Sequence, residues 1–535
     1  AAKTALAILR DTEPELHLRS VTLTAKDKIC LCETRECTPE ACPYANGYYA
    51  RIKGALWDVL DVPCLTAETL QEYAERHTVC PFELGLDSSL WSDVIIGDYN
   101  YLFDPVVHLV RFFESAGDYI FLVDEAHNLP GRAREMHSAA LTKTSFYEAK
   151  KLLGKGKSSL KNALTKVNDV FIEWRHRAEE ETAARDGRFG KTFFLKERSE
   201  EFDHLLNRLC EPLEAWLDDH REPDETHTAL LQLYFDVRAW LRVADTFDDH
   251  FVLQITASGS EVRAAQLCLD PSAFLADSFA LGRAAVLFSA TLAPASYYKD
   301  LCGVPEARAV ALRSPFPAGN QGLFCIGNVS TRYKDRDASL AIVAESLATM
   351  VRAHCGNYLA FFPSYAYMEQ AYAQFKEHCP EINCIKQENA MDEQQKAAFL
   401  AQFVPGPSQP LLGFAVMGGV FGEGVDLTGD RLIGVGIVGP GLPQVGPRQE
   451  QLRDYFEQTR GSGFDYAYRY PGMNKVLQAA GRVIRTPQDK GVVLLIDNRF
   501  AMPDYRRLMP PHWSHLKMIY DTEKLERELW RFWEE

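Results

Sequence analysis

The sequence predicts an α/β protein with parallel, doubly wound sheets, interrupted by a helical insertion. Short apolar runs rich in β-forming residues alternate with segments of helical periodicity, which is the pattern of parallel sheets. Some of these runs end abruptly in polar side chains, as buried parallel strands do at their carboxyl ends. The expected strands are 119–123, 284–291, 323–326, 358–362, 411–416, 432–438 and 491–497, and a further strand begins in 20–32.

A helical segment from about 140 to 247 separates two stretches of α/β sequence. Within it, apolar side chains recur at helical spacing and charged residues occupy the other positions. The clearest run is Phe202, Leu206, Leu209, Leu213 and Trp216. Residues 250–269 are then predicted to form a β-hairpin that turns at Gly259.

The composition is that of an ordinary globular protein, with 535 residues, 46% hydrophobic and 25% charged. This length predicts three or four domains of about 150 residues. No apolar run reaches the ~18 residues of a membrane-spanning helix, so we expect no membrane association. The net charge of −16 excludes a uniformly basic nucleic-acid-binding surface. Thirteen cysteines without a secretory signal predict a cytoplasmic protein, in which clustered cysteines favour metal binding over disulfides.

The segment Val-Asp-Glu-Ala-His, residues 123–127, places two adjacent carboxylates directly after an expected strand. Hydrolysis of a nucleoside triphosphate needs a magnesium ion near the phosphates and a carboxylate that positions the attacking water. Asp124 is the candidate for the metal and Glu125 for the water. The alternative is an ordinary polar turn in which Asp124 caps a helix.

The segment QAAGRVIR, residues 478–485, is predicted to be helical. Gln478, Arg482 and Arg485 then share one face, at i, i+4 and i+7, and Gly481 leaves room for close approach. Planar guanidinium groups suit the oxygens of a γ-phosphate, on which charge develops during hydrolysis. A solvated basic face is the alternative.

The glycine-rich loop 418–430 also follows an expected strand. Its glycines permit close approach of the backbone to a ligand. Gly424 lies between Glu423 and Asp426, whose carboxylates offer acceptors for a ribose on the nucleotide side, a metal-bound water or a neighbouring arginine. A plain strand-to-helix turn is an equally good interpretation.

Two segments are candidates for contact with a nucleic acid. Ser289 and Thr291, in SATLAP (289–294), are small hydroxyls at a strand end that can relay between a nucleotide site and a nucleic-acid groove. Ser364, in FFPSY (361–365), is expected to cap a helix whose first amides bind a phosphate, with Tyr365 available for base stacking. Ordinary helix caps are the alternative for both segments.

Four cysteines, Cys30, Cys37, Cys42 and Cys80, lie next to prolines and turns. Backbone amides left free in such segments can hydrogen-bond to sulfur, and four thiolates can hold a 4Fe-4S cluster or a zinc ion. The stretch lacks the C-x-x-C pair that is usual in structural zinc sites, and unrelated core thiols are a third interpretation. Cys32 is a rival to Cys30.

Taken in order, these motifs resemble the XPD/DinG-type iron–sulfur helicases of superfamily 2. The resemblance spans nearly the whole chain, and the joint order is far more specific than any single motif. In chain order the matching segments are the four cysteines, DYNYLFDP (98–105), VDEAHNLP (123–130), the helical insertion, LFSATLAP (287–294), FFPSY, GEGVD (422–426), QAAGRVIR and DNRF (497–500).

The resemblance implies two RecA-like motor domains in tandem, with an iron–sulfur domain and a helical arch domain inserted in the first. The implied bounds are 1–28, 83–138 and 249–318 for the first motor domain, 29–82 for the iron–sulfur domain, 139–248 for the arch and 319–535 for the second motor domain.

The implied activity is ATP-driven 5′–3′ translocation on single-stranded DNA by a monomer that unwinds forked, D-loop or R-loop structures in DNA repair. The implied cofactors are ATP, Mg²⁺ and a structural 4Fe-4S cluster, which the resemblance assigns to the four cysteines named above. His127 would couple the nucleotide site to SATLAP. Arg482 and Arg485 would sense the phosphate, with Gln478 as a partner.

The family's first motor domain opens with a phosphate loop, G-x-x-x-x-G-K-[ST], which this sequence lacks. Ala2-Lys3-Thr4 resembles the start of the motif that follows it. We therefore expect the 535 residues to belong to a longer protein; otherwise ATP affinity and turnover should be poor. The alternatives are a catalytically incomplete module that binds single-stranded nucleic acid, and a DEAH-type RNA helicase, against which the cysteines argue.

Overall fold

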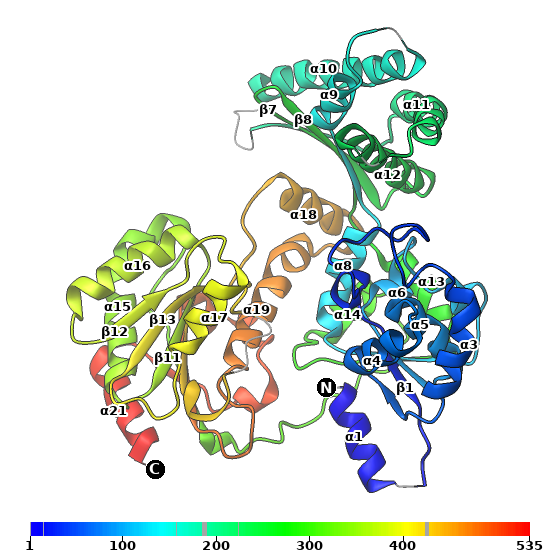
Figure 1. The fold of residues 1–535 in the computed structure, drawn as a ribbon. Coiled ribbons are helices and arrows are strands. Elements are labelled where there is room, and N and C mark those ends of the chain that lie inside the picture. The colour runs from blue at the N-terminus through cyan, green and yellow to red at the C-terminus, as the bar shows by residue number, and fades with distance from the viewer. Residues whose placement is uncertain are drawn as a thin grey trace. The chain divides into compact units, whose positions relative to one another are not determined.

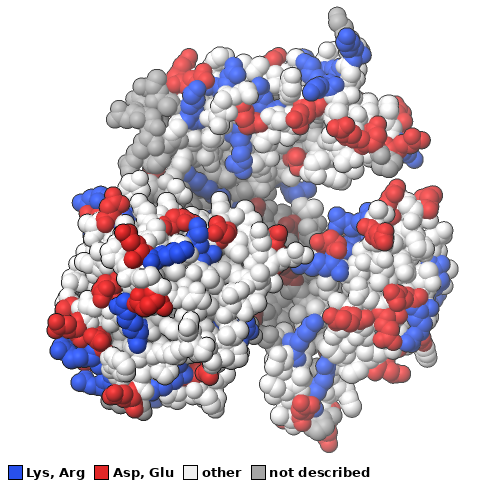
Figure 2. Space-filling view, turned by 60° about the vertical axis from the view of Figure 1, so that its left-hand side comes forward, with Lys and Arg blue, Asp and Glu red and all other residues white. Residues whose placement is uncertain are grey.

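The computed structural model describes residues 2–13, 15–156, 158–184, 190–222, 224–422 and 427–534 (Figure 1). The chain forms two compact units, residues 1–115 and 116–535. On the face seen in Figure 2, Lys and Arg side chains are interspersed with Asp and Glu. This face is therefore not uniformly basic, as the net charge predicts. Among the described helices, none is long and apolar enough to cross a bilayer.

The first unit contains a three-stranded parallel sheet with the order β2-β1-β3. Its core is formed by apolar side chains of the helices together with Val21 and Leu65 of the sheet. Its elements are α1 (Ala2–Thr12), β1 (Ser20–Thr22), α2 (Lys26–Ile29), α3 (Tyr48–Val59), β2 (Cys64–Leu65), α4 (Ala67–His77), α5 (Pro81–Ser88), β3 (Val94–Ile96), α6 (Asn100–Phe103) and α7 (Val110–Phe113). The strand expected to begin in 20–32 is therefore only three residues long.

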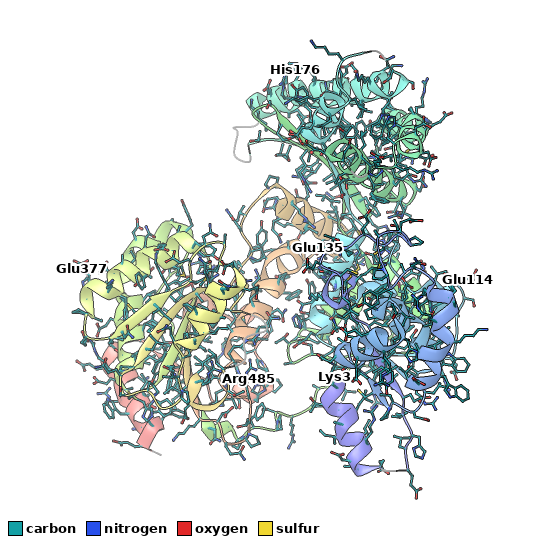
Figure 3. All side chains as sticks on the ribbon, in the orientation of Figure 1. Lys3, Glu114, Glu135, His176, Glu377 and Arg485 are labelled. Atoms are coloured by element: carbon teal, nitrogen blue, oxygen red, sulfur yellow. The ribbon has the colours of Figure 1, made fainter. Side chains whose placement is uncertain are left out.

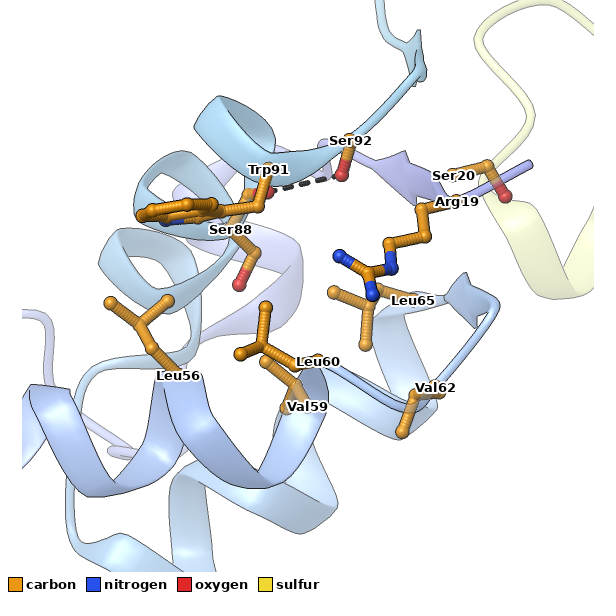
Figure 4. Close-up of a pocket in the computed structure, with 10 residues that line it drawn as sticks. All are labelled: Arg19, Ser20, Leu56, Val59, Leu60, Val62, Leu65, Ser88, Trp91 and Ser92. Carbon is orange, nitrogen blue, oxygen red and sulfur yellow. Dashed lines mark hydrogen bonds between the residues drawn. The ribbon is translucent and has the colours of Figure 1, made fainter. Parts of the chain in front are cut away.

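A small cavity lies against the end of α3 in this unit (Figure 4). Apolar side chains such as Leu56, Val59 and Leu65 line it, and Ser92 Oγ donates to the backbone oxygen of Ser88 at 3.0 Å. Its volume of about 20 Å³ matches a single water molecule. The cavity is therefore too small for a nucleotide.

The second unit contains a two-stranded parallel sheet, formed by β4 (Ile120–Val123) and β9 (Ala284–Leu287). Both strands were expected, although the second ends before Ser289. Val123 pairs with Leu287, so both strands deliver the residues that follow them to the same edge. The neighbouring helices are α8 (Leu129–Met136), α13 (Ser272–Ala280) and α14 (Ala295–Leu301).

The segment between these two strands folds around a hydrophobic core of its own. Four helices pack on an antiparallel sheet with the order β5-β8-β7-β6. The elements are β5 (Ala139–Thr142), α9 (Lys143–Leu152), α10 (Ser159–Ala184), β6 (Lys191–Leu195), α11 (Glu200–Asp219), α12 (Glu225–Asp245), β7 (Phe251–Ser258) and β8 (Glu261–Cys268).

The expected hairpin at 250–269 is confirmed as β7 and β8, with Gly259 at φ +59° in the turn. One set of its side chains belongs to the same core as the helices, because Leu253 and Ile255 pack in one cluster with Phe171 and Phe202. The alternate set, which includes Val252 and Leu267, packs instead with Leu301 of α14. The hairpin therefore packs on the helical insertion and on the segments that follow it, and the domain bounds implied by the resemblance stay a prediction. Helical periodicity signalled the helices, but not the short strands that complete their core.

A seven-stranded sheet forms the C-terminal lobe, with the order β12-β13-β11-β14-β15-β10-β16. Every neighbouring pair is parallel, as the alternation of strands and helices predicts. The strands are β10 (Gln321–Ile326), β11 (Asn357–Phe362), β12 (Asn383–Lys386), β13 (Leu411–Val416), β14 (Gly434–Val438), β15 (Gly491–Ile496) and β16 (Lys517–Ile519). All five expected strands are confirmed, and β12 and β16 are short edge strands that the sequence analysis missed.

Helices cover both faces of this sheet, so it is doubly wound (Figure 1). One face packs against α15 (Arg336–Arg352), α16 (Tyr365–His378) and α21 (Thr522–Glu534). The opposite face packs against α17 (Glu393–Ala401) and α19 (Tyr470–Ala480). The remaining helices of the lobe are α18 (Pro447–Arg460) and α20 (Pro503–Arg506), and a π-helical turn over 465–469 precedes α19.

A buried ion pair fixes the end of β15. Asp497 is fully buried, and its Oδ1 accepts from Arg499 Nε at 2.7 Å while its Oδ2 accepts from Thr331 Oγ1 at 2.5 Å. Burial alone would raise the pKa of Asp497, but the hydrogen bonds and charge of Arg499 outweigh it and lower the pKa. The DNRF segment thus ties β15 to the loop that carries Thr331.

We predict that Asp497→Asn lowers the free energy of unfolding by about 3 kcal/mol, because the Arg499 guanidinium loses its buried charged partner. Urea denaturation measures the loss. Asp504→Asn is the matched control, since Asp504 forms ion pairs at 49% side-chain exposure and should contribute about 1 kcal/mol or less.

The same pair predicts a pH dependence. Because the pKa of Asp497 is lowered on folding, its stabilisation is fully present above the unfolded value of about 4 and is lost as the pH falls through the lowered value. The difference in stability between wild type and Asp497→Asn should therefore shrink in acid. A difference that grows in acid would contradict this assignment.

Candidate functional site

The carboxyl ends of β4 and β9 bring two of the predicted motifs together. Asp124 and Glu125 follow β4, and Ser289 and Thr291 follow β9. Ser289 Oγ donates to Glu125 Oε2 at 3.2 Å, and the Thr291 amide donates to Ser289 Oγ at 3.2 Å. Two segments 164 residues apart therefore share one hydrogen-bonded edge.

Glu125 has a left-handed backbone, with φ +47°, which is uncommon for a residue other than glycine. The conformation turns the chain sharply at the end of the strand, and Asp124 Oδ1 accepts from the Glu125 amide at 2.8 Å. Glu125 occupies the N-cap position of the helical turn that follows and makes no side-chain capping bond there. Asp124 itself lies one position before that N-cap, and the strained backbone holds two carboxylates at a fixed strand end.

His127 is the buried centre of this edge, with a side chain that is 2% exposed. Its Nδ1 lies 2.8 Å from Ser289 Oγ and 3.3 Å from Glu125 Oε2. Its Nε2 hydrogen-bonds to the side chain of Gln478, at the end of α19. The imidazole thus connects the two strand ends with a helix of the C-terminal lobe, across 351 residues of sequence.

Neither hydroxyl after β9 acts as a helix cap. Pro294 occupies the N-cap position of α14, and it makes no side-chain capping bond there. Ser289 instead contacts Glu125 and His127, and Thr291 is 5% exposed. The structure therefore does not place Ser289 or Thr291 at the N-cap of α14, and their role as a relay stays a prediction.

The predicted helix over 478–485 is wrong in its second half, because α19 ends at Ala480. Gly481 and Arg482 lie in a turn, so Gln478, Arg482 and Arg485 do not share one helical face. Glycine is a poor helix former and occupies the position at which the helix ends. The short spacing still keeps the three residues near one another at the end of α19.

The two arginines lie beside tightly packed apolar side chains that include Phe421 and Leu427. Arg482 Nη2 donates to the backbone oxygen of Gly422 at 2.7 Å, next to the glycine-rich loop. The Arg485 amide donates to Asp489 Oδ2 at 2.7 Å, and Figure 3 labels Arg485 on the C-terminal lobe. Glu423, Gly424 and Asp426, which were predicted on the nucleotide side, lie outside the described residues.

Ser364 caps α16, as expected, because its Oγ accepts from the Tyr367 amide at 3.4 Å. The same Oγ also accepts from Arg336 Nη1 at 3.2 Å. No sequence pattern pointed to Arg336, which lies 28 residues away on another helix. Tyr365 is half-buried, and its hydroxyl accepts from Gln387 Nε2 at 2.7 Å, so its ring is partly held by the protein.

A separate cavity in the first unit gathers five cysteines. Its volume is about 210 Å³, and its lining includes Cys30, Cys32, Cys37, Cys42 and Cys80. The four cysteines predicted as ligands therefore face one space. Cys32 lines it as well, with Sγ 3.8 Å from Cys42 Sγ. Burial and the neighbouring sulfurs of Cys42 and Cys30 raise the pKa of Cys32 to about 11.

The residues around this cavity fit a thiolate-bound group. Cys80 precedes α5, whose first position is Pro81. Burial raises the pKa of the Cys80 thiol, whereas the backbone amides of Phe82 and Glu83 hydrogen-bond to its sulfur and favour the thiolate. In the part of the chain that the structure describes, no three His, Cys, Asp or Glu side chains converge closely enough to hold a single metal ion.

Two protein families match the chain. The DEAD_2 family matches residues 14–146, and the family described as a helicase C-terminal domain matches residues 347–516. The first match contains the five-cysteine cavity and the VDEAH segment. The second contains Gln478, Arg482 and Arg485.

Curated relatives are helicases or helicase subunits by name. The helicase subunit XPD of the general transcription and DNA repair factor IIH from Schizosaccharomyces pombe is 24% identical over 83% of this chain and 67% of its own length. ATP-dependent DNA helicase CHL1 from Coccidioides immitis is 22% identical over 84% of this chain and 60% of its own length. Regulator of telomere elongation helicase 1 from Rattus norvegicus is 22% identical over 92% of this chain and 45% of its own length. The chain thus spans about half to two thirds of these relatives.

Solved structures of XPD helicases share the fold. One XPD helicase superposes with a TM-score of 0.60 at 18% identity and covers 96% of this chain and 89% of its own. Xpd4 from S. tokodaii gives a TM-score of 0.55 at 16% identity, over 81% of this chain and 83% of its own. The order of the motifs, the matching families and this shared fold together show that the chain belongs to the XPD/DinG-type helicases of superfamily 2.

Proposed function

We propose that the protein containing this chain is an ATP-dependent DNA helicase that translocates 5′ to 3′ on single-stranded DNA. The observation that carries the proposal is the hydrogen-bonded chain from Glu125 through Ser289 and His127 to Gln478. It joins two strand ends to a helix of the C-terminal lobe. A motor needs such a connection, because hydrolysis at one place must change the position of another.

The two carboxylates divide the chemistry of hydrolysis. Asp124 would hold the Mg²⁺ shell, and when bound this ion supplies charge neutralisation on the β- and γ-phosphates. Glu125 orients the attacking water and accepts its proton, because its carboxylate is held at the strand end by Ser289. Arg482 and Arg485, with Glu423, Gly424 and Asp426 of the adjacent loop, are proposed to contact the nucleotide from the C-terminal lobe.

His127 and the hydroxyls of SATLAP report the state of the nucleotide. A change in the position of Glu125 alters its bond to Ser289, and His127 transmits that change to Gln478. Thr291 and Ser364 are proposed to contact the backbone of single-stranded DNA, with Tyr365 stacking on a base. Such contacts are independent of sequence and sensitive to salt. We propose that a monomer acts on forked, D-loop or R-loop structures in the cytoplasm.

The cysteine cavity is proposed to hold a 4Fe-4S cluster on Cys30, Cys37, Cys42 and Cys80. Support comes from the shared cavity and from the amides of α5 that face Cys80. The cluster, when bound, supplies a rigid cross-link between segments that contain little regular structure. The cysteines themselves tie the irregular stretch between α2 and α3 to the start of α5.

We predict that Glu125→Gln in the full-length protein lowers ATP turnover by about 10²–10⁴-fold, because the amide cannot accept the proton of the attacking water. ATP binding should persist, since the carboxylate acts on the water. Steady-state ATPase assays and nucleotide-binding measurements check both. Glu135→Gln on α8 is the matched control and should retain turnover; unchanged ATPase in Glu125→Gln would exclude the assignment.

We predict that His127→Ala and Gln478→Ala act as one unit. If the imidazole transmits its effect through Gln478, the double variant should lose no more DNA-stimulated ATPase activity than the less active of the two single variants. A double-mutant cycle measures this, with Gln374→Ala on α16 as the control. Losses that simply multiply would show that the two residues act independently.

We predict that Cys37→Ser removes bound iron and acid-labile sulfide, because one of four thiolate ligands is lost. Cys355→Ser is the control, since Cys355 is exposed and lies outside the cavity. Iron, sulfide and zinc analysis with visible absorption of anaerobically purified protein gives the readout. Stoichiometric zinc without sulfide would contradict the cluster and favour a zinc-stabilised module.

A further inference from the structure

The cysteine cavity contains one more thiol than the proposed cluster needs. Five cysteines line it, and four of them account for a complete ligand set. The fifth, Cys32, is separated from Cys30 by a single residue and from Cys42 by ten positions. The role of Cys32 is therefore not explained by cluster binding alone.

Cys32 is in sulfur contact with one of the proposed ligands. Its Sγ lies 3.8 Å from Cys42 Sγ, and a disulfide has a bond of about 2.05 Å, so each sulfur has to move by only about 1 Å. Rotation about χ1 moves a sulfur by more than this distance. The two thiols are thus placed to bond to each other without a rearrangement of the fold.

The surrounding chain allows such a movement. Residues 30–47, between α2 and α3, contain turns and bends but no helix or strand. The Cys42 amide donates to Thr38 O at 2.9 Å, so Cys42 sits in a local turn. Cys32 and Cys42 are both half-buried, which leaves them open to a small oxidant.

We propose that Cys32 and Cys42 form a disulfide when hydrogen peroxide oxidises the cavity in the absence of its cluster. One thiolate attacks the peroxide, forms a sulfenic acid and releases water. The other thiolate then displaces the hydroxyl group as a second water, so two thiols and one peroxide give one disulfide and two waters. The peroxide is the oxidant, and a dithiol reverses the reaction.

The disulfide removes Cys42 from the ligand set and so closes the cavity to iron. This consequence rests on the proposed cluster, but formation of the bond does not. Cys32 then makes cluster assembly depend on redox state. The reduced cavity binds iron and sulfide, and the oxidised cavity does not bind them until the disulfide is reduced. The four-ligand assignment is unchanged in the reduced protein.

Peptide mapping of the iron-free chain tests the bond directly. Trypsin cleaves after Lys28, Arg35 and Arg51, which places Cys32 in peptide 29–35 and Cys42 in peptide 36–51. After treatment with one equivalent of hydrogen peroxide and digestion without reductant, wild type should yield these two peptides linked. Cys30→Ser should retain the link, because it keeps Cys32, and Cys32→Ser should lose it. Fragmentation of the linked species should locate the bond at Cys42.

Reconstitution with ferrous iron and sulfide tests whether the disulfide prevents iron binding. Peroxide-treated wild type should take up iron only after dithiothreitol, whereas Cys32→Ser should take up iron with or without the reductant. Absence of the linked peptide from wild type, its persistence in Cys32→Ser or a bond at Cys37 would overturn the proposal. If reduced wild type takes up no iron, the proposed cluster fails, whereas the linked peptide would still confirm the thiol pair.

Discussion

The proposed function depends on one hydrogen-bonded connection, in which buried His127 joins Glu125 and Ser289 to Gln478. Parallel strands deliver their carboxyl ends to one edge, so Glu125 and Ser289 meet although 164 residues separate them. A buried imidazole can serve both sides because its two nitrogens point in opposite directions. The left-handed backbone of Glu125 indicates that the position of this carboxylate is specified at a cost in local conformational energy.

Sequence patterns predicted the buried parallel strands well, since apolar runs such as 411–416 and 491–497 are long and distinct. Short edge strands escaped, because β16 has only three residues and no alternation to recognise. The helix over 478–485 was predicted too long, because the i, i+4, i+7 spacing outweighed the glycine at its centre. Contacts set by the tertiary fold, such as Arg336 on Ser364, leave no trace in local sequence.

The cysteine cavity also shows what local sequence can and cannot predict. Spacing and flanking prolines identified four cysteines, and the structure places all four around one cavity. Local sequence could not show whether Cys32 or Cys30 faced that space, and the structure shows that both do. Two sulfurs in contact have chemistry that neither has alone, because the product of their oxidation is a bond between segments.

ATP hydrolysis by the full-length protein with and without single-stranded DNA tests the central claim most directly. Because the strand-end carboxylates are connected to α19, we expect single-stranded DNA to raise the turnover number for ATP several-fold. Single-stranded RNA of the same sequence should raise it less. A protein that binds ATP but hydrolyses none of it in the presence of single-stranded DNA would contradict the account.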